Sequence, residues 1–371
     1  MKYAADWVFL CEEAYGGCFI LALFGGVVEH PCSQWPILLM AFCDYNGDRA
    51  ALQLPHPMRL LVLRNKLSTP QFVSALSLIF FAPLCLSVRA QEVRHSFFVA
   101  GPDFTGIVGE DGEKQWDSGR KGARDGWVLP NGNVLIAWND VVREMTPAKE
   151  VVFEYRLDAS NKELGTVQRL KDGRTLITEL GTNPRLLEVE ANGKIALEFP
   201  LQPETDNAHM QTRMARKLAN GNYLVPHLLA FKVKEYTAEG NVVKEFPTDM
   251  EDLGGRAAKN WPFTAIRLAG GNTLVCLTNG NKVVEMDSEG KVVWKITNED
   301  LPGNPIDDAC GGQRLPNGNT VITAYHAKKG VKLFEVNREK QLVWKFEGPY
   351  RVHHFQILTT NGKPIEGEPL K

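Results

Sequence analysis

A ten-residue pattern occurs six times between Trp127 and the end of the chain, and this repetition restricts the fold more than any other feature. Each copy has two short apolar runs on either side of a turn that contains glycine. The copies are WVLPNGNVLI from Trp127, QRLKDGRTLI from Gln168, RKLANGNYLV from Arg216, IRLAGGNTLV from Ile266, QRLPNGNTVI from Gln313 and the degenerate QILTTNGKPI from Gln356. Asn-Gly and Asp-Gly tolerate the positive φ that two-residue hairpins need, so each copy predicts a β-hairpin.

The distance between copies indicates how the hairpins are assembled. The turn glycines are separated by 41, 48, 50, 47 and 44 residues: Gly132, Gly173, Gly221, Gly271, Gly318 and Gly362. This is the period of a four-stranded propeller blade.

A second hairpin motif alternates with the first. Its copies are VVREMTPAKEVVFEY from Val141, RLLEVEANGKIALEF from Arg185, KVKEYTAEGNVVKEF from Lys232, KVVEMDSEGKVVWKI from Lys282 and KLFEVNREKQLVWKF from Lys332. A weaker copy, GIVGEDGEKQW from Gly106, has no first motif before it, and the last first-type hairpin has no second motif after it. We therefore predict an all-β, six-bladed propeller of four-stranded blades. Pairing of the N- and C-terminal strands would close the ring and remove its exposed edges.

The sequence before the repeats divides into two parts. Residues 1–57 hold four of the seven cysteines and show no repeat, so we interpret them as an over-extended start, with Met58 as the initiator. Residues 58–90 combine a basic segment, the apolar run FVSALSLIFFAPLCLS and the small-residue pattern Val88-Arg89-Ala90, which predicts a signal peptide. Residues 91–371 would then be an exported propeller, periplasmic or extracellular. An uncleaved signal would instead anchor the chain to a membrane.

Composition excludes some partners. The net charge is −2 and no basic patch stands out, so we expect no nucleic-acid binding. Two cysteines, Cys276 and Cys310, follow the predicted cleavage site. The sequence allows a disulfide bond between them but does not require it. The histidines and cysteines show no metal-binding spacing, so no metal is expected.

Strand direction predicts which face of the ring carries function. Both kinds of short turn fall on one face, and the connections between strands two and three and between blades fall on the other. We expect the latter to be long and irregular, at residues 156–166, 200–213, 247–263 and 297–311. Binding residues concentrate on such loops.

The candidate site residues are polar side chains expected at that face. We predict His209 and His354 as catalytic candidates. The predicted ligand-binding residues are Arg124, Asp125, Arg213, His227, Trp261, Asp308, His326 and His353. Two recurring sets are interpreted instead as contacts between blades, because repeats use such residues to build the repeat. They are Glu144, Glu188, Glu235, Glu285 and Glu335, and the aromatic residues Trp116, Phe153, Trp294 and Trp344.

The alternation of LPNGNTLI-like and VVEVDxxGKVVW-like segments resembles the repeats of quinoprotein-dehydrogenase-like (PQQ-repeat-like) propellers. It is more closely similar to the six-bladed arylsulfotransferase-like proteins. The resemblance implies a channel histidine that accepts a sulfuryl group, here His209 or His354, with Arg124 and Arg213 as anion donors. Quinone-binding relatives have eight blades and, in several cases, adjacent cysteines, so no quinone or other cofactor is expected in this chain.

Three functions remain open from the sequence. The first is a binding module for an unknown small molecule, glycan or protein, acting through the loop face and the channel. The second is an arylsulfotransferase-like enzyme. The third is a calcium-dependent, lactonase-like hydrolase, with candidate oxygen ligands Asn139, Glu179, Asn279 and Asp308.

Overall fold

The computed structural model describes residues 7–14, 17–24, 42–43 and 92–371, except residue 328. The chain forms two compact units, Met1–Ser87 and Val88–Lys371. In the first unit, β1 (Trp7–Ala14) pairs with β2 (Gly17–Phe24), and β2 pairs with β3 (Phe42–Cys43). The predicted signal peptide lies outside the described residues.

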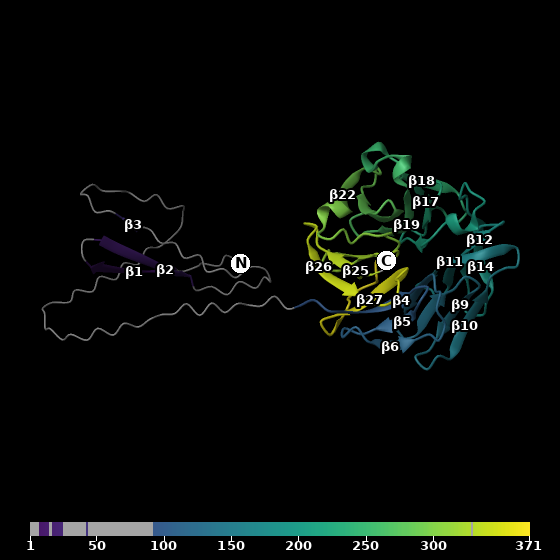
Figure 1. Ribbon diagram of the computed structural model, residues 1–371, viewed down its shortest axis with the longest axis horizontal. Coiled ribbons are helices and arrows are strands. Elements are labelled where there is room, and N and C mark those ends of the chain that lie inside the picture. Colours follow the sequence, from purple (N-terminus) through teal and green to yellow (C-terminus); the bar gives the residue numbers. More distant parts are fainter. Residues whose placement is uncertain (1–6, 15–16, 25–41, 44–91, 328) are drawn as a thin grey trace. The chain divides into compact units, whose positions relative to one another are not determined.

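The second unit is a ring of six antiparallel sheets, which confirms the predicted propeller (Figure 1). Blade 1 contains β7 (Asp125–Val128), β8 (Val134–Ala137), β9 (Val141–Met145) and β10 (Val151–Arg156). Blade 2 contains β11 (Asn161–Arg169), β12 (Thr175–Gly181), β13 (Arg185–Val189) and β14 (Ile195–Pro200). Blade 3 contains β15 (Arg216–Lys217), β16 (Tyr223–His227), β17 (Lys232–Tyr236) and β18 (Val242–Pro247). Blade 4 contains β19 (Asn260–Arg267), β20 (Thr273–Asn279), β21 (Lys282–Met286) and β22 (Val292–Thr297). Blade 5 contains β23 (Gly312–Arg314), β24 (Thr320–Thr323), β25 (Val331–Val336) and β26 (Leu342–Glu347).

Blade 6 closes the ring by pairing strands from the two ends of the propeller, as predicted. Its strand order is β28 (Lys363–Pro364), β27 (His354–Thr360), β4 (His95–Ala100), β5 (Thr105–Val108) and β6 (Lys114–Asp117). The two unpaired motifs imply that each end supplies two strands. The structure differs, because β4, from the N-terminal end, pairs with β27 and supplies the second strand. The first turn motif does not follow β4 (HSFFVA), because its partner strand, β27, lies at the other end of the chain and no turn joins the two.

The first-type turns differ in detail from the prediction. The six turn glycines all have positive φ, from 77° to 91°, whereas the preceding Asn131, Asp172, Asn220 and Asn317 do not. In blade 1 the Gly132 N–H donates to the Leu129 carbonyl at 2.9 Å, and the Leu129 N–H donates to Asn133 at 2.8 Å. The turn is therefore a three-residue loop that ends in a left-handed glycine, and not a two-residue primed turn. In the first five turns only the glycine needs the left-handed conformation. In the sixth, Asn361 (φ 50°) and Gly362 (φ 77°) both adopt it between the paired Thr360 and Lys363, so this turn has the predicted two-residue form.

The recurring glutamate joins neighbouring blades, as predicted. In blade 4 the Glu285 carboxylate accepts from Asn272 of its own first turn at 2.8 Å and from Arg314 of blade 5 at 3.0 Å. The same arrangement links Glu144 to Asn133 and Arg169, and Glu235 to Asn222 and Arg267. The motif residues Asn, Glu and Arg are thus parts of one contact, repeated around the ring.

The contact changes where the ring closes. Glu335 of blade 5 accepts from His95 at 2.8 Å, because the position equivalent to Arg314 in blade 6 is Ile357. Between blades 6 and 1, Ile107 and Val128 replace the glutamate and the cation, and both pack against one hydrophobic cluster. The closing blade therefore uses different chemistry from the internal repeats.

Long connections lie mainly between blades. The links between strands two and three are mostly short, for example residues 138–140 and 182–184, so the expectation of long loops there is wrong for most blades. The interblade connections carry the 3-10 helices η1 (Ala208–Met210), η2 (Glu251–Leu253), η3 (Arg256–Ala258) and η4 (Asn298–Asp300). In the part of the chain that the structure describes, no helix is long and apolar enough to cross a membrane.

Candidate functional site at the channel mouth

Four of the side chains on the loop face form a hydrogen-bonded cluster, which we call the channel-mouth cluster: Arg124, Glu163, His209 and Arg213. The Glu163 carboxylate accepts from Arg124 and from Arg213, each at 3.0 Å. The guanidinium of Arg213 also lies 3.0 Å from His209 Nδ1. Arg124 precedes β7, Glu163 belongs to β11, and the other two lie in the connection from blade 2 to blade 3. Three sequence-predicted residues are thus brought together by Glu163.

Burial divides the cluster into a fixed base and an accessible top. The side chains of Arg213 and Glu163 are 1% and 10% exposed, whereas that of His209 is 59% exposed. Burial would raise the pKa of Glu163, but hydrogen bonding to His209 and the charges of Arg213 and Arg124 lower it to about 2. Burial lowers the pKa of Arg213 to about 10, against the effect of Glu163. At neutral pH the cluster therefore holds two guanidinium charges and one carboxylate.

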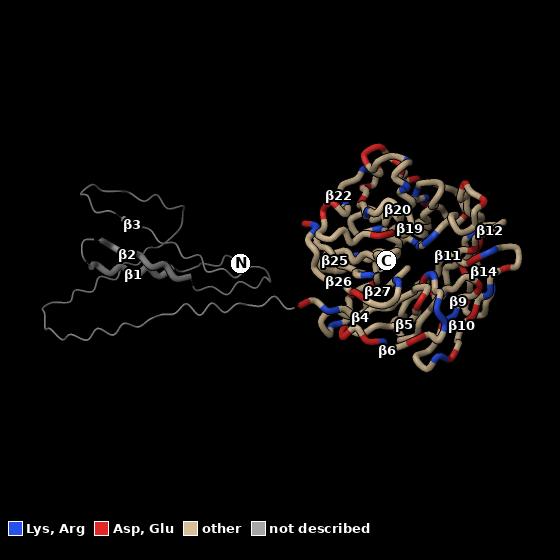
Figure 2. The backbone as a smooth tube through the Cα atoms, viewed as in Figure 1, with Lys and Arg blue, Asp and Glu red and all other residues tan. Residues whose placement is uncertain are grey.

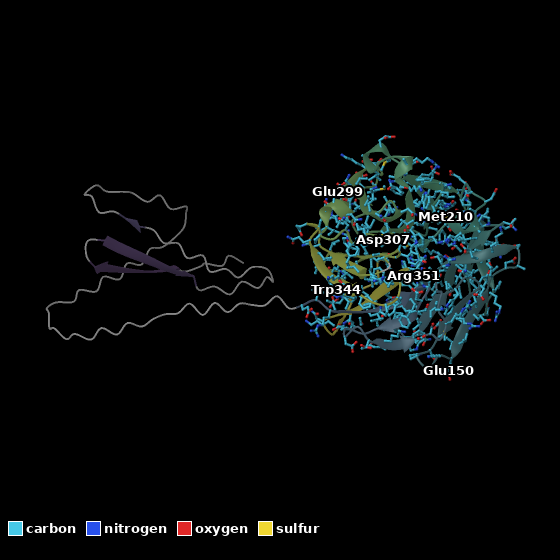
Figure 3. The ribbon with its side chains drawn as sticks, in the orientation of Figure 1. Glu150, Met210, Glu299, Asp307, Trp344 and Arg351 are labelled. Atoms are coloured by element: carbon cyan, nitrogen blue, oxygen red, sulfur yellow. The ribbon has the colours of Figure 1, made fainter. Side chains whose placement is uncertain are left out.

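An apolar group adjoins these charges. The Arg213 guanidinium carbon lies 5.9 Å from the centre of the Phe263 ring. Phe263 packs with buried Met214, Leu228 and Cys310, and with the partly buried Met210, Trp261 and Tyr325. Met210, Asp307 and Arg351, which come from three different connections, lie around the middle of the ring (Figure 3). The mouth thus combines cations with an aromatic and thioether surface.

His353 supports this apolar group. Its ring meets Phe263 and Tyr325 edge-on, at centroid distances of 4.9 and 5.2 Å. Its Nδ1 donates to the carbonyl of Arg124 at 3.0 Å. Burial holds the pKa of His353 well below its usual range, helped by the charge of Arg124. The structure therefore places His353 as a neutral support beneath the mouth.

His354 is enclosed beside Asp125 and Lys371, at a place that we call the channel floor. Its side chain is fully buried, with Nδ1 3.1 Å from Asp125. Burial lowers its pKa to about 3. Asp125 also accepts from Arg216 at 2.9 Å. The two catalytic candidates, His209 and His354, therefore occupy different environments, one accessible and one enclosed.

The remaining candidates lie outside the channel-mouth cluster. Asp308 pairs with the half-exposed His326 at 3.0 Å, and burial raises the pKa of Asp308. His227 is fully buried against the hydroxyl of Tyr236 at 2.9 Å. Trp261 packs on the apolar group, although none of the described residues accepts a hydrogen bond from its indole nitrogen.

Two further sequence expectations concern metals and disulfides. Within the described ranges no group of three His, Cys, Asp or Glu side chains is placed to hold a metal ion. Glu179, a calcium-ligand candidate, is fully buried and accepts from Arg185 at 2.9 Å, from Asn161 and from the hydroxyl of Tyr155. Cys276 and Cys310 are both free and buried.

A cavity lies away from this mouth. It has a volume of about 580 Å³ and contains none of the predicted site residues. Its lining is Asp103, Phe104, Thr105, Lys114, Asp117, Gly119, Arg120, Lys121 and Lys149. The convergence of buried and exposed charges with an apolar surface makes the channel mouth the stronger candidate.

Sequence reasoning missed three residues of this region. Glu163 was expected in an irregular loop but belongs to β11, where it lies opposite Leu180 in the ladder with β12. Tyr325 follows β24 and is not among the predicted site residues. Lys371, the last residue of the sequence, reaches the channel floor, and no local pattern indicates that position.

The profile of the family described as Mal s 1 allergenic protein-like matches residues 101–315 of this chain. A search of curated proteins finds no match. Among solved structures, the chain is similar to a protein of unknown function from Bacteroides caccae, with 20% identity and a TM-score of 0.62 over 74% of this chain and 100% of that one.

Two other solved structures are more distant. A chain of a nidogen/laminin complex has 8% identity and a TM-score of 0.51, over 71% of this chain and 98% of that one. Virginiamycin B lyase from Staphylococcus aureus has 14% identity and a TM-score of 0.48, over 67% and 85%. Identities this low show similarity of fold alone.

Proposed function

The chain belongs to the Mal s 1 allergenic protein-like family, and on that premise we propose that it is a binding module whose channel mouth takes a small organic anion. The observation that carries the proposal is the buried Arg213, held by Glu163 beside the exposed His209. Arg124 and Arg213 leave one positive charge in excess over Glu163. An anionic group of a ligand would balance that charge in a partly desolvated place, where such pairing is strongest.

The apolar group favours a ligand with an aromatic or aliphatic part. Phe263, Tyr325 and Met210 adjoin the charges and are supplied by three separate connections or strands. Sites for small ligands commonly combine an apolar lining with a few fixed polar groups. An aryl sulfate or aryl carboxylate matches both halves of the mouth.

Binding is favoured over sulfuryl transfer by the hydrogen bonds of His209. A guanidinium only donates, so its contact with Nδ1 at 3.0 Å uses the lone pair of that nitrogen. The contact of Nδ1 with Glu163 is longer, at 3.4 Å. In the tautomer that accepts from Arg213, the ring proton lies on Nε2, which then has no free lone pair for attack on sulfur. An arylsulfotransferase-like reaction would need the other tautomer. His354, the other candidate nucleophile, is enclosed on the channel floor.

The test uses 4-methylumbelliferyl sulfate as the anionic probe and 4-methylumbelliferone as its uncharged counterpart, with binding measured by calorimetry. We expect the sulfate to bind and the phenol to bind at least about tenfold more weakly. Arg213→Met should weaken sulfate binding, whereas Arg94→Met, at an exposed arginine of the same chain, should not. Equal binding of both probes would contradict the proposal.

The same probe also tests the arylsulfotransferase-like alternative. Release of fluorescent phenol in the presence of an acceptor phenol, lost in His209→Ala, would support transfer instead of binding alone. Binding without release would leave the protein a binding module.

We also propose that the propeller acts after export, because residues 58–90 carry the pattern of a cleavable signal. N-terminal sequencing of the protein from its native host should begin at Gln91. A mature protein that retains residues 58–90 would contradict cleavage and favour a membrane anchor.

A further inference from the structure

The final residues of the sequence enter the middle of the ring, where Figure 1 marks the C-terminus. The Leu370 carbonyl accepts from the backbone of Arg314 at 2.9 Å, on the innermost strand of blade 5. The Lys371 carbonyl accepts from Arg216 of blade 3 at 2.8 Å. The tail, defined as residues 366–371, therefore contacts separate blades at the axis.

The side chain of Lys371 is fully enclosed by groups that suit an amine. Its Nζ donates to the Gly126 carbonyl at 2.7 Å and lies 3.2 Å from His354 Nδ1 and 3.4 Å from Asp125. It also lies 3.9 Å from the centre of the Trp127 ring. Two oxygen acceptors, an imidazole nitrogen and an aromatic face are groups by which proteins recognise an alkylammonium ion.

The surrounding site is held in place without Lys371. Asp125 accepts from its neighbour Gly126 N–H at 2.9 Å, from the Thr166 hydroxyl at 3.0 Å and from Arg216 at 2.9 Å. The indole of Trp127 donates to the Val167 carbonyl at 2.6 Å. The carboxylate and the ring would therefore keep their positions if the lysine side chain were removed.

The tail itself is mostly outside the core. Residues 366–368 are exposed and residues 369–370 are half-buried, whereas Lys371 is buried. Glu368 pairs with Lys171 at 3.1 Å, and both side chains are more than half exposed. Leu370 packs against a hydrophobic cluster of the ring, and Lys371 is the fully buried side chain of the tail.

We propose that the channel floor is a binding site for primary alkylamines, which Lys371 fills as an internal ligand. The site is formed by Asp125, Gly126, Trp127 and His354, and it is distinct from the anion site proposed for the channel mouth. Burial lowers the pKa of Lys371 to about 7, so both the ammonium and the free amine are populated near neutral pH. Either form can donate to the acceptors around it.

The test removes the internal ligand and replaces it from solution. In the full chain, Lys371→Ala should lower the thermal midpoint, and n-butylamine should raise it again by about 2 °C or more. The uncharged n-butanol should not. The unchanged protein should not respond to n-butylamine, because the covalently attached tail has a high effective concentration.

Two further variants make the outcome decisive. Adding Asp125→Asn to Lys371→Ala should abolish the response to n-butylamine. Lys371→Met keeps the aliphatic stem and removes the amine, so it remains informative if the alanine variant does not fold. The proposal is overturned if Lys371→Met is as stable as the unchanged protein, or if n-butanol restores Lys371→Ala as well as n-butylamine does.

Discussion

Glu163 and Arg213 form a 3.0 Å ion pair although 50 residues separate them in the sequence. One lies on the innermost strand of blade 2 and the other in the connection that leads to blade 3. The pair fixes a buried cation directly beneath the exposed His209, which is how a rigid ring supports a charged site at its mouth. Charges of both signs are otherwise mixed around the ring (Figure 2).

Removing one partner of this pair should be costly. Glu163→Ala would leave Arg213 buried without its carboxylate, and we expect a loss of about 3 kcal/mol in unfolding free energy. Replacing both residues by apolar ones, Glu163→Leu with Arg213→Met, should cost much less. Chemical denaturation measures both. Equal losses in the two variants would mean that packing, not charge, dominates at this place.

The interblade glutamates should matter for stability. Glu285→Ala removes the acceptor shared by Asn272 and Arg314, and we expect a loss of about 2 kcal/mol. Glu299→Ala, at an exposed position in η4, serves as the control and should change stability by less than about 0.5 kcal/mol. Both values come from denaturant titration. Similar results for the two variants would remove the structural role given to the repeated glutamate.

Acid should weaken the ring before carboxylates titrate. Burial depresses the pKa of His227, His353 and His354 in the folded protein. Below pH 6.5 the unfolded chain binds protons that the folded chain does not, so stability falls as pH decreases. Thermal midpoints between pH 6.5 and 5 measure this, and His227→Phe should make the fall less steep. A midpoint that is constant over that range would contradict it.

The two cysteines of the propeller, Cys276 and Cys310, should be unreactive in the folded protein. Burial raises the pKa of Cys276 to about 12 and that of Cys310 well above its usual range. Because the thiolate is the reactive form, a thiol reagent such as Ellman's should label neither residue under native conditions and both in denaturant. In a native Cys310→Ser variant, label found on the peptide that contains Cys276 would contradict this.

The fold was predictable because it depends on local patterns that repeat. Each turn glycine needs a positive φ, Glu144, Glu235 and Glu285 each bind an Asn and an Arg of the repeated motif, and the period of the copies sets the blade size. The second strand of blade 6 was not predictable in this way, since β4 contains no turn and finds its partner, β27, 264 residues away at His95 and Thr359.

The candidate site was predictable only in part. The order of strands and turns in the sequence placed Arg124, Arg213, His353 and His354 at the loop face. It did not separate an accessible histidine from an enclosed one, because burial depends on what the other blades contribute. Glu163 and Lys371 carry no local signal.

The sequence by itself determined the all-β class, the blade period and the residues that join one blade to the next, because these follow from short-range backbone preferences and from repetition. Only the tertiary structure decided which charges meet at the channel mouth and which residue fills its floor. Those contacts join residues from different blades, and their energies depend on burial that no single repeat contains.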